Sequence, residues 1–392
     1  MKSKLSSLLV QLANLVLVAS GCATSSSEPI RIGATMSETG SYATQGIPAR
    51  NGYLLCEKHV NEQGGILGRQ VEFLIHDDES SSDRAIELYR RLITRDSVDA
   101  LMGPYGSTLT EAIAPVTEEH RQVLISPLAA TTSIWEQGRR YLFMVLPPAE
   151  LFLAGLVEIA DDNDLRRVAI LQEDALFPRA AGQGAVDLAR ERGMDVIIHE
   201  TYPSGTSDFS AIIERLRAEN VEVLGMAASA LGDFITVARQ MNELGVSVEM
   251  FGTSGAVDEF REALGPIAEL TFGLSAWEPG LPNPGVSEFV RDYEQEFGRA
   301  PSFHAAGAYG SCQLFMEVAR RAGSLDSEVL REVLLGLATQ TVFSSFAVDE
   351  RGYQTANRGL FVQWQDGEKV VVWPGEQATA RPRFRSAAEG LR

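Results

Sequence analysis

Two short turns rich in glycine, proline and hydroxyl residues are the stretches of this chain best suited to hold a small molecule. The first, 103–110, follows an apolar strand at 98–102 and leads into a helix that we expect from Thr110 to His120. The second, 125–132, follows a strand expected at 122–125. Free N–H groups and the helix dipole attract an anion to such a turn. Because parallel strands end at one edge of a sheet, we predict that both turns form one polar pocket for a carboxylate or similar group.

Catalytic motifs are missing from the sequence. None of the five histidines lies at a recognisable spacing from a nucleophile, and no GxSxG, GxxxxGK[ST] or GxGxxG pattern occurs. The run His76–Glu79 is a weak metal candidate, because acids at a strand end are far more often solvated or capping. No CxxC or His/Cys cluster is present. We therefore predict a binding protein rather than an enzyme, without a cofactor or a metal.

Composition and charge narrow the choice of partner. The chain has 392 residues, of which 45% are hydrophobic, so it is long enough for two domains with sizeable cores. Its formal net charge is −19, with the acids spread along the chain. A protein that binds nucleic acid would carry a basic face, so we expect no nucleic-acid partner.

Strands alternate with helices from Ile30 nearly to the end of the chain. This alternation predicts an α/β protein whose parallel sheets are flanked by helices. The pattern restarts after Pro147–Pro148, which indicates two lobes. A proline-rich crossing at 277–284 leads to further helices and to a hairpin around Asp366–Gly367. Residues 376–392 are predicted to form a loose tail.

The N-terminus resembles a bacterial lipoprotein signal over residues 1–21. A basic start precedes an apolar run, Leu8–Val18, that is too short to span a membrane, and small residues then lead to Cys22. The resemblance implies cleavage before Cys22, a lipid on its thiol, and anchoring in the periplasm or on the outer cell surface. An ordinary secretory signal is the alternative. Residues 22–29 would form a flexible tether.

Cys56 and Cys312 lie among apolar residues of helical pattern. We predict buried free thiols, and a disulfide in an oxidising compartment is the alternative.

A series of motifs from Ile30 to Pro374 resembles the branched-chain amino-acid-binding proteins of ABC importers. Their order and spacing, rather than any single motif, carry the resemblance. In chain order they are Ser37-x-Thr39-Gly40 through Gly46, Asn61–Arg69, Asp77–Asp78, Gly103-Pro104-x-x-Ser107, Ile125–Pro127, Ala238–Met241, Phe297–Pro301 and Val370–Pro374.

This resemblance implies the type I periplasmic-binding fold, in which two Rossmann-like lobes joined by three crossings close on a ligand. Lobe 1 would comprise 28–148 and 278–348, and lobe 2 would comprise 149–277 and 349–375. The protein would be a monomer that delivers its ligand, a hydrophobic amino acid, to ABC permease subunits. The alternatives are a receptor for a non-amino-acid carboxylate, amide or urea-like solute, and a sensor coupled to signalling.

The resemblance also assigns a ligand site in lobe 1. Ser107 matches the serine whose hydroxyl and backbone N–H hold the ligand carboxylate. Ala129–Thr131 resembles a segment that holds the ligand ammonium through a carbonyl and a threonine hydroxyl. Leu128 lengthens the offset by one residue, so Ala130 could take the place of the threonine. Tyr42, Gln45 and Tyr105 complete the lobe 1 side of the cleft.

In lobe 2 the chain departs from the family pattern. Ser254 replaces an acid that would neutralise the ammonium, and Phe177 and Ala230 lie at or near tyrosine positions. Asp174, Asp233 and Glu259 are the acids in nearby loops that could supply the missing charge. The predicted lobe 2 site residues are Asp174, Phe177, Ala230 and Ser254.

Overall fold

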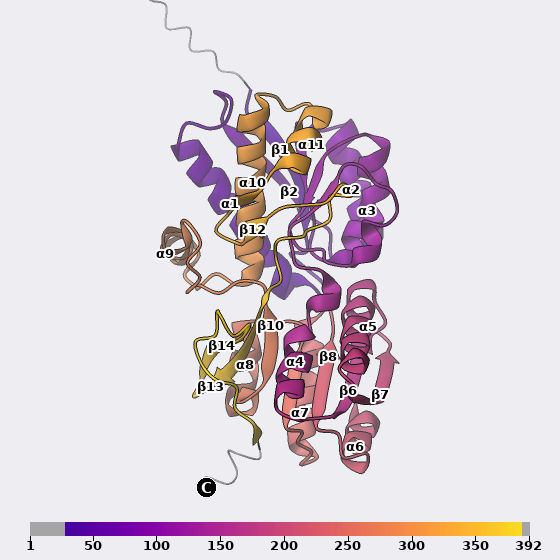
Figure 1. Cartoon of the computed structure of the whole chain (residues 1–392). Helices are drawn as coiled ribbons and strands as arrows, with labels where there is room; N and C mark the ends of the chain where they lie inside the picture. The colour runs from indigo at the N-terminus through magenta and orange to yellow at the C-terminus, as the bar shows by residue number, and fades with distance from the viewer. Residues whose placement is uncertain (1–27, 386–392) are drawn as a thin grey trace, which may run out of the picture.

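The computed structural model describes residues 28–385. They form two α/β lobes, one above the other in Figure 1. The predicted signal, Cys22 and residues 386–392 of the predicted tail lie outside the described residues. Within 28–385, no helix is long and apolar enough to cross a membrane. The two-lobed α/β fold predicted from the sequence is confirmed.

The upper lobe contains a five-stranded parallel sheet in the order β2-β1-β3-β4-β5. Helices α2 and α3 cover one face, and α1, α10 and α11 lie on the other (Figure 1). Helix α2 shows why such segments fold: Ala85, Leu88 and Leu92 form a buried face, and the Ser81 side chain caps the first turn. The strands are β1 (Ile30–Met36), β2 (Val71–Asp77), β3 (Ala100–Met102), β4 (Leu124–Ser126) and β5 (Leu142–Met144), and the helices are α1 (Ala43–Glu62), α2 (Ser82–Thr94), α3 (Ser107–Glu119), α9 (Val286–Phe297), α10 (Phe303–Ala322) and α11 (Ser327–Gly336).

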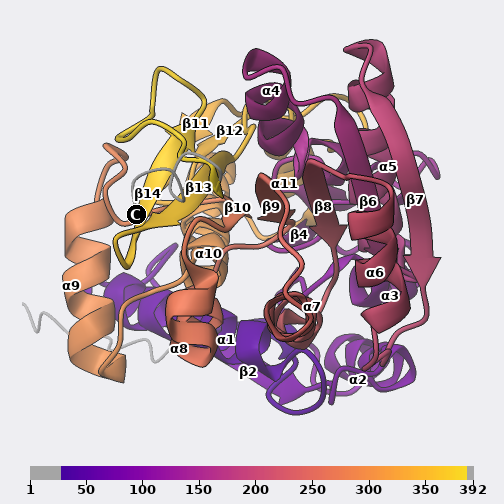
Figure 2. The same cartoon turned by 90° about the horizontal axis from the view of Figure 1, so that it is seen from below.

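The lower lobe contains a seven-stranded sheet in the order β14-β13-β10-β9-β8-β6-β7. Figure 2 shows α4 on one side of this sheet and α6, α7 and α8 on the other. Strands β13 and β14 form the predicted hairpin, because Asp366 and Gly367 both adopt a left-handed backbone conformation. The strands are β6 (Arg167–Glu173), β7 (Asp195–Tyr202), β8 (Val223–Ala227), β9 (Met250–Thr253), β10 (Phe272–Ser275), β13 (Leu360–Gln365) and β14 (Glu368–Trp373), and the helices are α4 (Ala154–Asp162), α5 (Leu176–Glu191), α6 (Ser210–Ala218), α7 (Leu231–Glu243) and α8 (Asp258–Leu264).

Three segments carry the chain between the lobes: after β5, after β10, and between β12 (Ser345–Phe346) and β13. Side chains tie these segments together. Gln354 and Asn357, in the third segment, both donate to the carbonyl oxygen of Val145 in the first. The indole of Trp277 in the second segment donates to Val342. Hydrogen bonds therefore link the first and third crossings to each other, and the second crossing to the loop before β12.

The predicted loose tail is wrong for residues 376–385, which are bound to the lower lobe. Gln363 on β13 both donates to the carbonyl oxygen of Arg383 (2.8 Å) and accepts from its N–H (2.9 Å). Gln365 donates to Arg381 (2.8 Å). Both glutamine side chains are buried. The composition of the tail gave no sign of this attachment, because its partners are side chains of a strand.

A disulfide bond joins Cys56 of α1 to Cys312 of α10, so the prediction of free thiols is wrong. Both cysteines are buried, as predicted. The two helices pack so closely that a Cβ atom on Gly52 would lie 2.2 Å from the carbonyl oxygen of Ala305. The pairing depends on a contact between positions 256 residues apart, and local sequence patterns do not reveal such a contact.

We predict that the disulfide stabilises the upper lobe mainly by restricting the unfolded chain. The double variant Cys56→Ala/Cys312→Ala should lose about 3–5 kcal/mol of unfolding free energy, because the closed loop is long. Urea unfolding followed by circular dichroism measures this loss. Reductant should destabilise the wild-type protein and leave the double variant unchanged. Equal stability of the wild type and the double variant in the absence of reductant would contradict this prediction.

Candidate functional site

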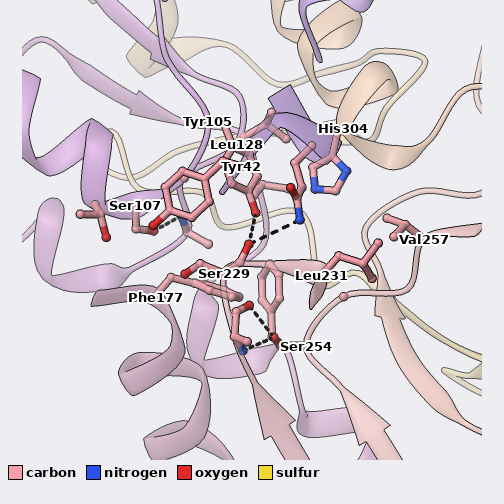
Figure 3. Close-up of a pocket in the computed structure, with 18 of the residues that line it drawn as sticks. Tyr42, Tyr105, Ser107, Leu128, Phe177, Ser229, Leu231, Ser254, Val257 and His304 are labelled. Atoms are coloured by element: carbon pink, nitrogen blue, oxygen red, sulfur yellow. Dashed lines mark hydrogen bonds between the residues drawn. The ribbon is translucent and has the colours of Figure 1, made fainter. Parts of the chain in front are cut away.

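A pocket lies between the lobes, where the carboxyl ends of the two sheets face each other (Figure 3). About 700 Å³ of space free of protein atoms lies within its outline, part of it open to solvent. Eight of the predicted site residues line it: Tyr42, Gln45, Tyr105, Ser107, Leu128, Ala130, Phe177 and Ser254. The other four, Ala129, Thr131, Asp174 and Ala230, are not among the lining residues.

Ser107 joins the two glycine- and hydroxyl-rich turns. Its Oγ accepts hydrogen bonds from the N–H groups of Ala130 (3.1 Å) and Thr131 (3.2 Å). The N–H of Gly106 also donates to the carbonyl of Leu128 (3.2 Å). The turns therefore lie side by side. Because its oxygen serves as the acceptor for two donors, the Ser107 hydroxyl keeps its own hydrogen for another partner, and no acceptor for it is found within residues 28–385.

Helix α3 begins at Ser107, three residues before the predicted start at Thr110. Gly106 precedes it with a φ of 82°, a conformation that glycine adopts readily. The first N–H groups of a helix have no partner within it, and residues 106–109 line the pocket. The positive end of α3 therefore faces the pocket beside Ser107.

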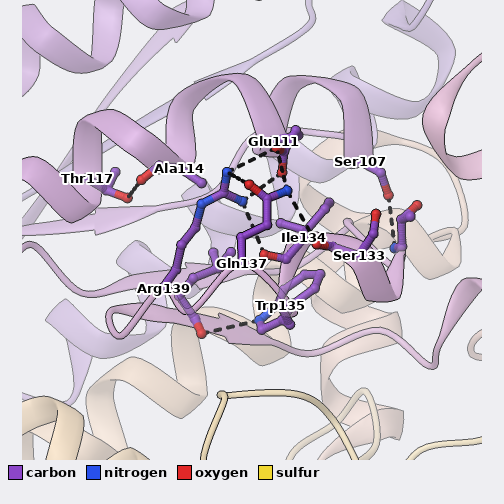
Figure 4. Close-up of polar contacts among 11 residues, drawn as sticks. Ser107, Glu111, Ala114, Thr117, Ser133, Ile134, Trp135, Gln137 and Arg139 are labelled. Atoms are coloured by element: carbon purple, nitrogen blue, oxygen red, sulfur yellow. Dashed lines mark hydrogen bonds and ion pairs between the residues drawn. The ribbon is translucent and has the colours of Figure 1, made fainter.

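A half-buried ion pair holds α3 one turn after Ser107 (Figure 4). Arg139 contacts Glu111 at 2.7 Å and also donates to the carbonyl of Ile134. Burial acts to raise the pKa of Glu111, but hydrogen bonds from Arg139 and Gln137 outweigh it and lower that pKa. This contact fastens the segment after the second turn to the helix that carries Ser107.

The lower lobe contacts the upper lobe through the backbone of Ser229. Its carbonyl oxygen accepts from the Tyr105 hydroxyl (3.1 Å) and, at 3.5 Å, from the Gln45 amide (Figure 3). The Gln45 Oε1 atom is buried and has no hydrogen-bond partner in the described part of the chain. These bonds cross the cleft, so the structure represents a closed arrangement of the lobes.

Aromatic and aliphatic side chains cover the lower-lobe side of the pocket. Phe177 packs edge to face on Phe152, with 4.9 Å between ring centroids, and Leu231, Phe234 and Val257 also line the pocket. Ser254 adds little polarity, because its hydroxyl is paired with the backbone N–H (3.3 Å) and carbonyl (3.4 Å) of Ala228.

The three acids that the sequence offers as counter-charges have other partners. Asp174 pairs with Arg179 at 2.7 Å, Asp233 accepts from the Tyr202 hydroxyl at 2.8 Å, and Glu259 pairs with Arg299. None of them is among the residues that line the pocket.

Glu173 is the nearby acid that sequence reasoning missed. It is 5% exposed and accepts from the N–H of Ser229 (2.8 Å) and the hydroxyl of Ser204 (2.6 Å). The available signal was its place at the end of β6, one residue before Asp174. A shift of one residue turns a side chain to the other face of a strand.

His304 is a second missed residue. It lies in the first turn of α10 and lines the pocket opposite Ser107 (Figure 3). Its ring packs edge to face on Tyr105, with 5.5 Å between ring centroids. Burial lowers the pKa of His304 to about 3, so its ring is neutral near pH 7. No hydrogen bond to either ring nitrogen is found among residues 28–385.

We predict that this buried histidine makes stability depend on pH. The pKa of His304 is about 3 in the folded protein and 6.5 for the free group, so the unfolded chain binds more protons between these values. Its contribution is complete above pH 6.5 and is lost as the pH falls toward 3. From pH 7 to pH 4.5, the unfolding free energy of wild type should fall by about 2 kcal/mol relative to His304→Phe.

Urea unfolding at the two pH values measures this difference. The neighbouring substitution Phe303→Leu, which removes no titrating group, should change stability equally at both. A constant difference between wild type and His304→Phe would contradict the prediction.

The fold and this pocket define a class of two-lobed ligand-binding proteins. Residues 29–369 match the family model described as "Periplasmic binding protein", and the chain belongs to this family. No group of three or more potential metal ligands occurs in the described ranges.

Individual relatives agree with this assignment. The Leu/Ile/Val-binding protein homolog 7 of Brucella suis biovar 1 is 23% identical over 398 residues, which cover 96% of this chain and 98% of that protein. A branched-chain amino acid transporter substrate-binding protein from Streptococcus pneumoniae, solved in complex with isoleucine, gives a TM-score of 0.79 at 22% identity and covers 88% of this chain and 100% of its own. A solute-binding protein of an ABC transporter from Rhodopseudomonas palustris BisB5, solved with 3,4-dihydroxybenzoic acid, gives 0.76 at 22% identity and covers 87% and 95%. These two structural likenesses show the fold.

Proposed function

We propose that this protein is an extracytoplasmic solute-binding protein that captures a small hydrophobic carboxylate between its lobes and delivers it to an ABC importer. The observation that carries this proposal is the state of the Ser107 hydroxyl. Its oxygen accepts from two backbone N–H groups, and no acceptor for its own hydrogen is found among residues 28–385. The apolar pocket around it suits the body of such a ligand. The protein binds and releases its ligand without changing it.

Two ligand classes fit this description. The names of the Brucella relatives point to a hydrophobic amino acid, and the apolar lining suits its side chain. A carboxylate that is not an amino acid is the second candidate. It is favoured by the absence of any carboxylate side chain among the described residues that line the pocket.

The proposal extends to where the protein works. We propose a monomer anchored through a lipid on Cys22, in the periplasm or on the outer cell surface. The disulfide between Cys56 and Cys312 supports an oxidising compartment outside the cytoplasm.

Ser107→Ala should weaken a carboxylate ligand by about 1–3 kcal/mol, because it removes a charge-assisted hydrogen bond from a buried site. Isothermal titration calorimetry with the wild-type ligand measures the change. Ser311→Ala, which removes a buried hydroxyl of α10 that does not line the pocket, should leave the affinity unchanged. Equal affinities for wild type and Ser107→Ala would contradict the assigned pocket.

Tyr105→Phe should release the ligand faster by roughly fivefold, because it removes one hydrogen bond of about 1 kcal/mol between the closed lobes. Stopped-flow measurement of ligand dissociation tests this. The matched control is Tyr89→Phe, whose hydroxyl donates to Met102 within the upper lobe. That control should reduce stability and leave the release rate unchanged. Identical release from both variants would show that the bond does not hold the lobes together.

A further inference from the structure

The polar groups of the pocket are arranged for a ligand with one charged end. We infer that its ligand is a hydrophobic monocarboxylate that lacks an ammonium group, so that the pocket discriminates against amino acids. This inference rests on the proposed function and names the ligand class of the same site.

An ammonium group in the closed pocket would have no counter-charge on the pocket wall. No aspartate or glutamate is found among the described residues that line the pocket. Glu173, a buried acid that is not among the lining residues, accepts from Ser229 and Ser204, and its charge reaches the pocket only as a secondary cause that raises the pKa of Tyr42 and Tyr105. The titratable groups that do line the pocket are Tyr42, Tyr105 and His304. Burial raises the pKa of both tyrosines and lowers that of the histidine, so all three are neutral near pH 7.

Three backbone carbonyl groups beside the pocket already accept hydrogen bonds from the protein. The carbonyl oxygen of Ala130 accepts from Ala149 (2.8 Å), and that of Leu128 accepts from Gly106 (3.2 Å). Across the cleft, the carbonyl of Ser229 already accepts from Tyr105 and Gln45.

The lining keeps uncharged acceptors, among them Gln45 Oε1, which has no hydrogen-bond partner among residues 28–385, and the hydroxyls of Thr108 and Ser229, but none of them carries a charge. Ala130, which has no hydroxyl, lines the pocket, whereas Thr131 does not. The hydroxyl of Ser254 is paired with Ala228. A buried cation that lacks an opposite charge is strongly disfavoured, even where uncharged acceptors remain. The pocket is therefore poorly suited to a zwitterion.

The groups around Ser107, in contrast, are suited to bind a carboxylate. The Ser107 O–H and the first N–H groups of α3 can donate hydrogen bonds to an anion. The positive end of the helix dipole attracts the same negative charge. No acid lies in the first turn of α3 to repel it. Phe152, Phe177 and Phe234 provide an apolar surface for the rest of the ligand. A single negative charge on an aliphatic or aromatic body satisfies all of these groups.

Matched pairs of ligands test this inference on the full mature protein. 4-Methylpentanoate differs from leucine, and 3-phenylpropanoate from phenylalanine, only by the ammonium group. In the pair that binds best, calorimetry at pH 7 should give a Kd at least 100-fold lower for the acid without the ammonium group than for the amino acid. Leucine or phenylalanine binding as tightly as its partner would overturn the inference.

A charge placed at position 254 gives a second readout. Ser254→Asp should shift the preference toward the amino acid by at least tenfold, and Ser254→Asn, of similar size without the charge, should not. Melting temperatures of the unliganded variants check that both fold. Equal preferences in the two variants would show that the missing acid does not set the ligand class.

The outcomes separate this inference from the proposed function. If leucine binds tightly and Ser107→Ala weakens it, the binding function stands and the inference is wrong. Tight binding of the neutral 4-methylpentanamide, with no binding of either acid, would also overturn the inference. The protein would then still be a binding protein. If neither the paired ligands nor a broad set of acids, amides and ureas raises the melting temperature, both are wrong.

Discussion

The hydroxyl group of Ser107 is the point on which the site depends. By accepting from the N–H groups of Ala130 and Thr131, it joins the turn after β3 to the turn after β4 at the start of α3. The same arrangement leaves its hydrogen and the first N–H groups of the helix directed at one small region. A buried anion needs several donors at once, and this junction supplies them without a charged side chain.

Closure of the lobes completes the pocket in which we propose that the anion binds. The carbonyl of Ser229 reaches across the cleft to Tyr105 and Gln45, and phenylalanine side chains of the lower lobe cover the remaining space. Excluding water strengthens hydrogen bonds to an anion and makes an uncompensated cation more costly. In the binding mode that we infer, the apolar lower lobe sets specificity because it offers no counter-charge to a cation, and the upper lobe sets it through the donors around Ser107.

The sequence predicted the features that depend on neighbouring residues. The alternating elements, the hairpin turn at Asp366–Gly367 and the two turns that Ser107 joins follow from local patterns. Errors arose where one residue decides which way a side chain points, because Asp174 pairs with Arg179 while its neighbour Glu173 is buried, or where distant segments meet. The Cys56–Cys312 bridge, the binding of residues 376–385 to β13, and the place of His304 in the pocket depend on tertiary contacts. Phe303 and His304 begin a helix far along the chain, and only packing brings them to the cleft.

A crystal structure of the protein with its tightest-binding small acid would test the central claim most directly. The account predicts closed lobes, with the ligand carboxylate within hydrogen-bond distance of Ser107 Oγ and of N–H groups in the first turn of α3. The body of the ligand should lie against Phe152 and Phe177, without a cationic group. A ligand bound outside this pocket, or one whose carboxylate leaves Ser107 without a contact, would contradict the account.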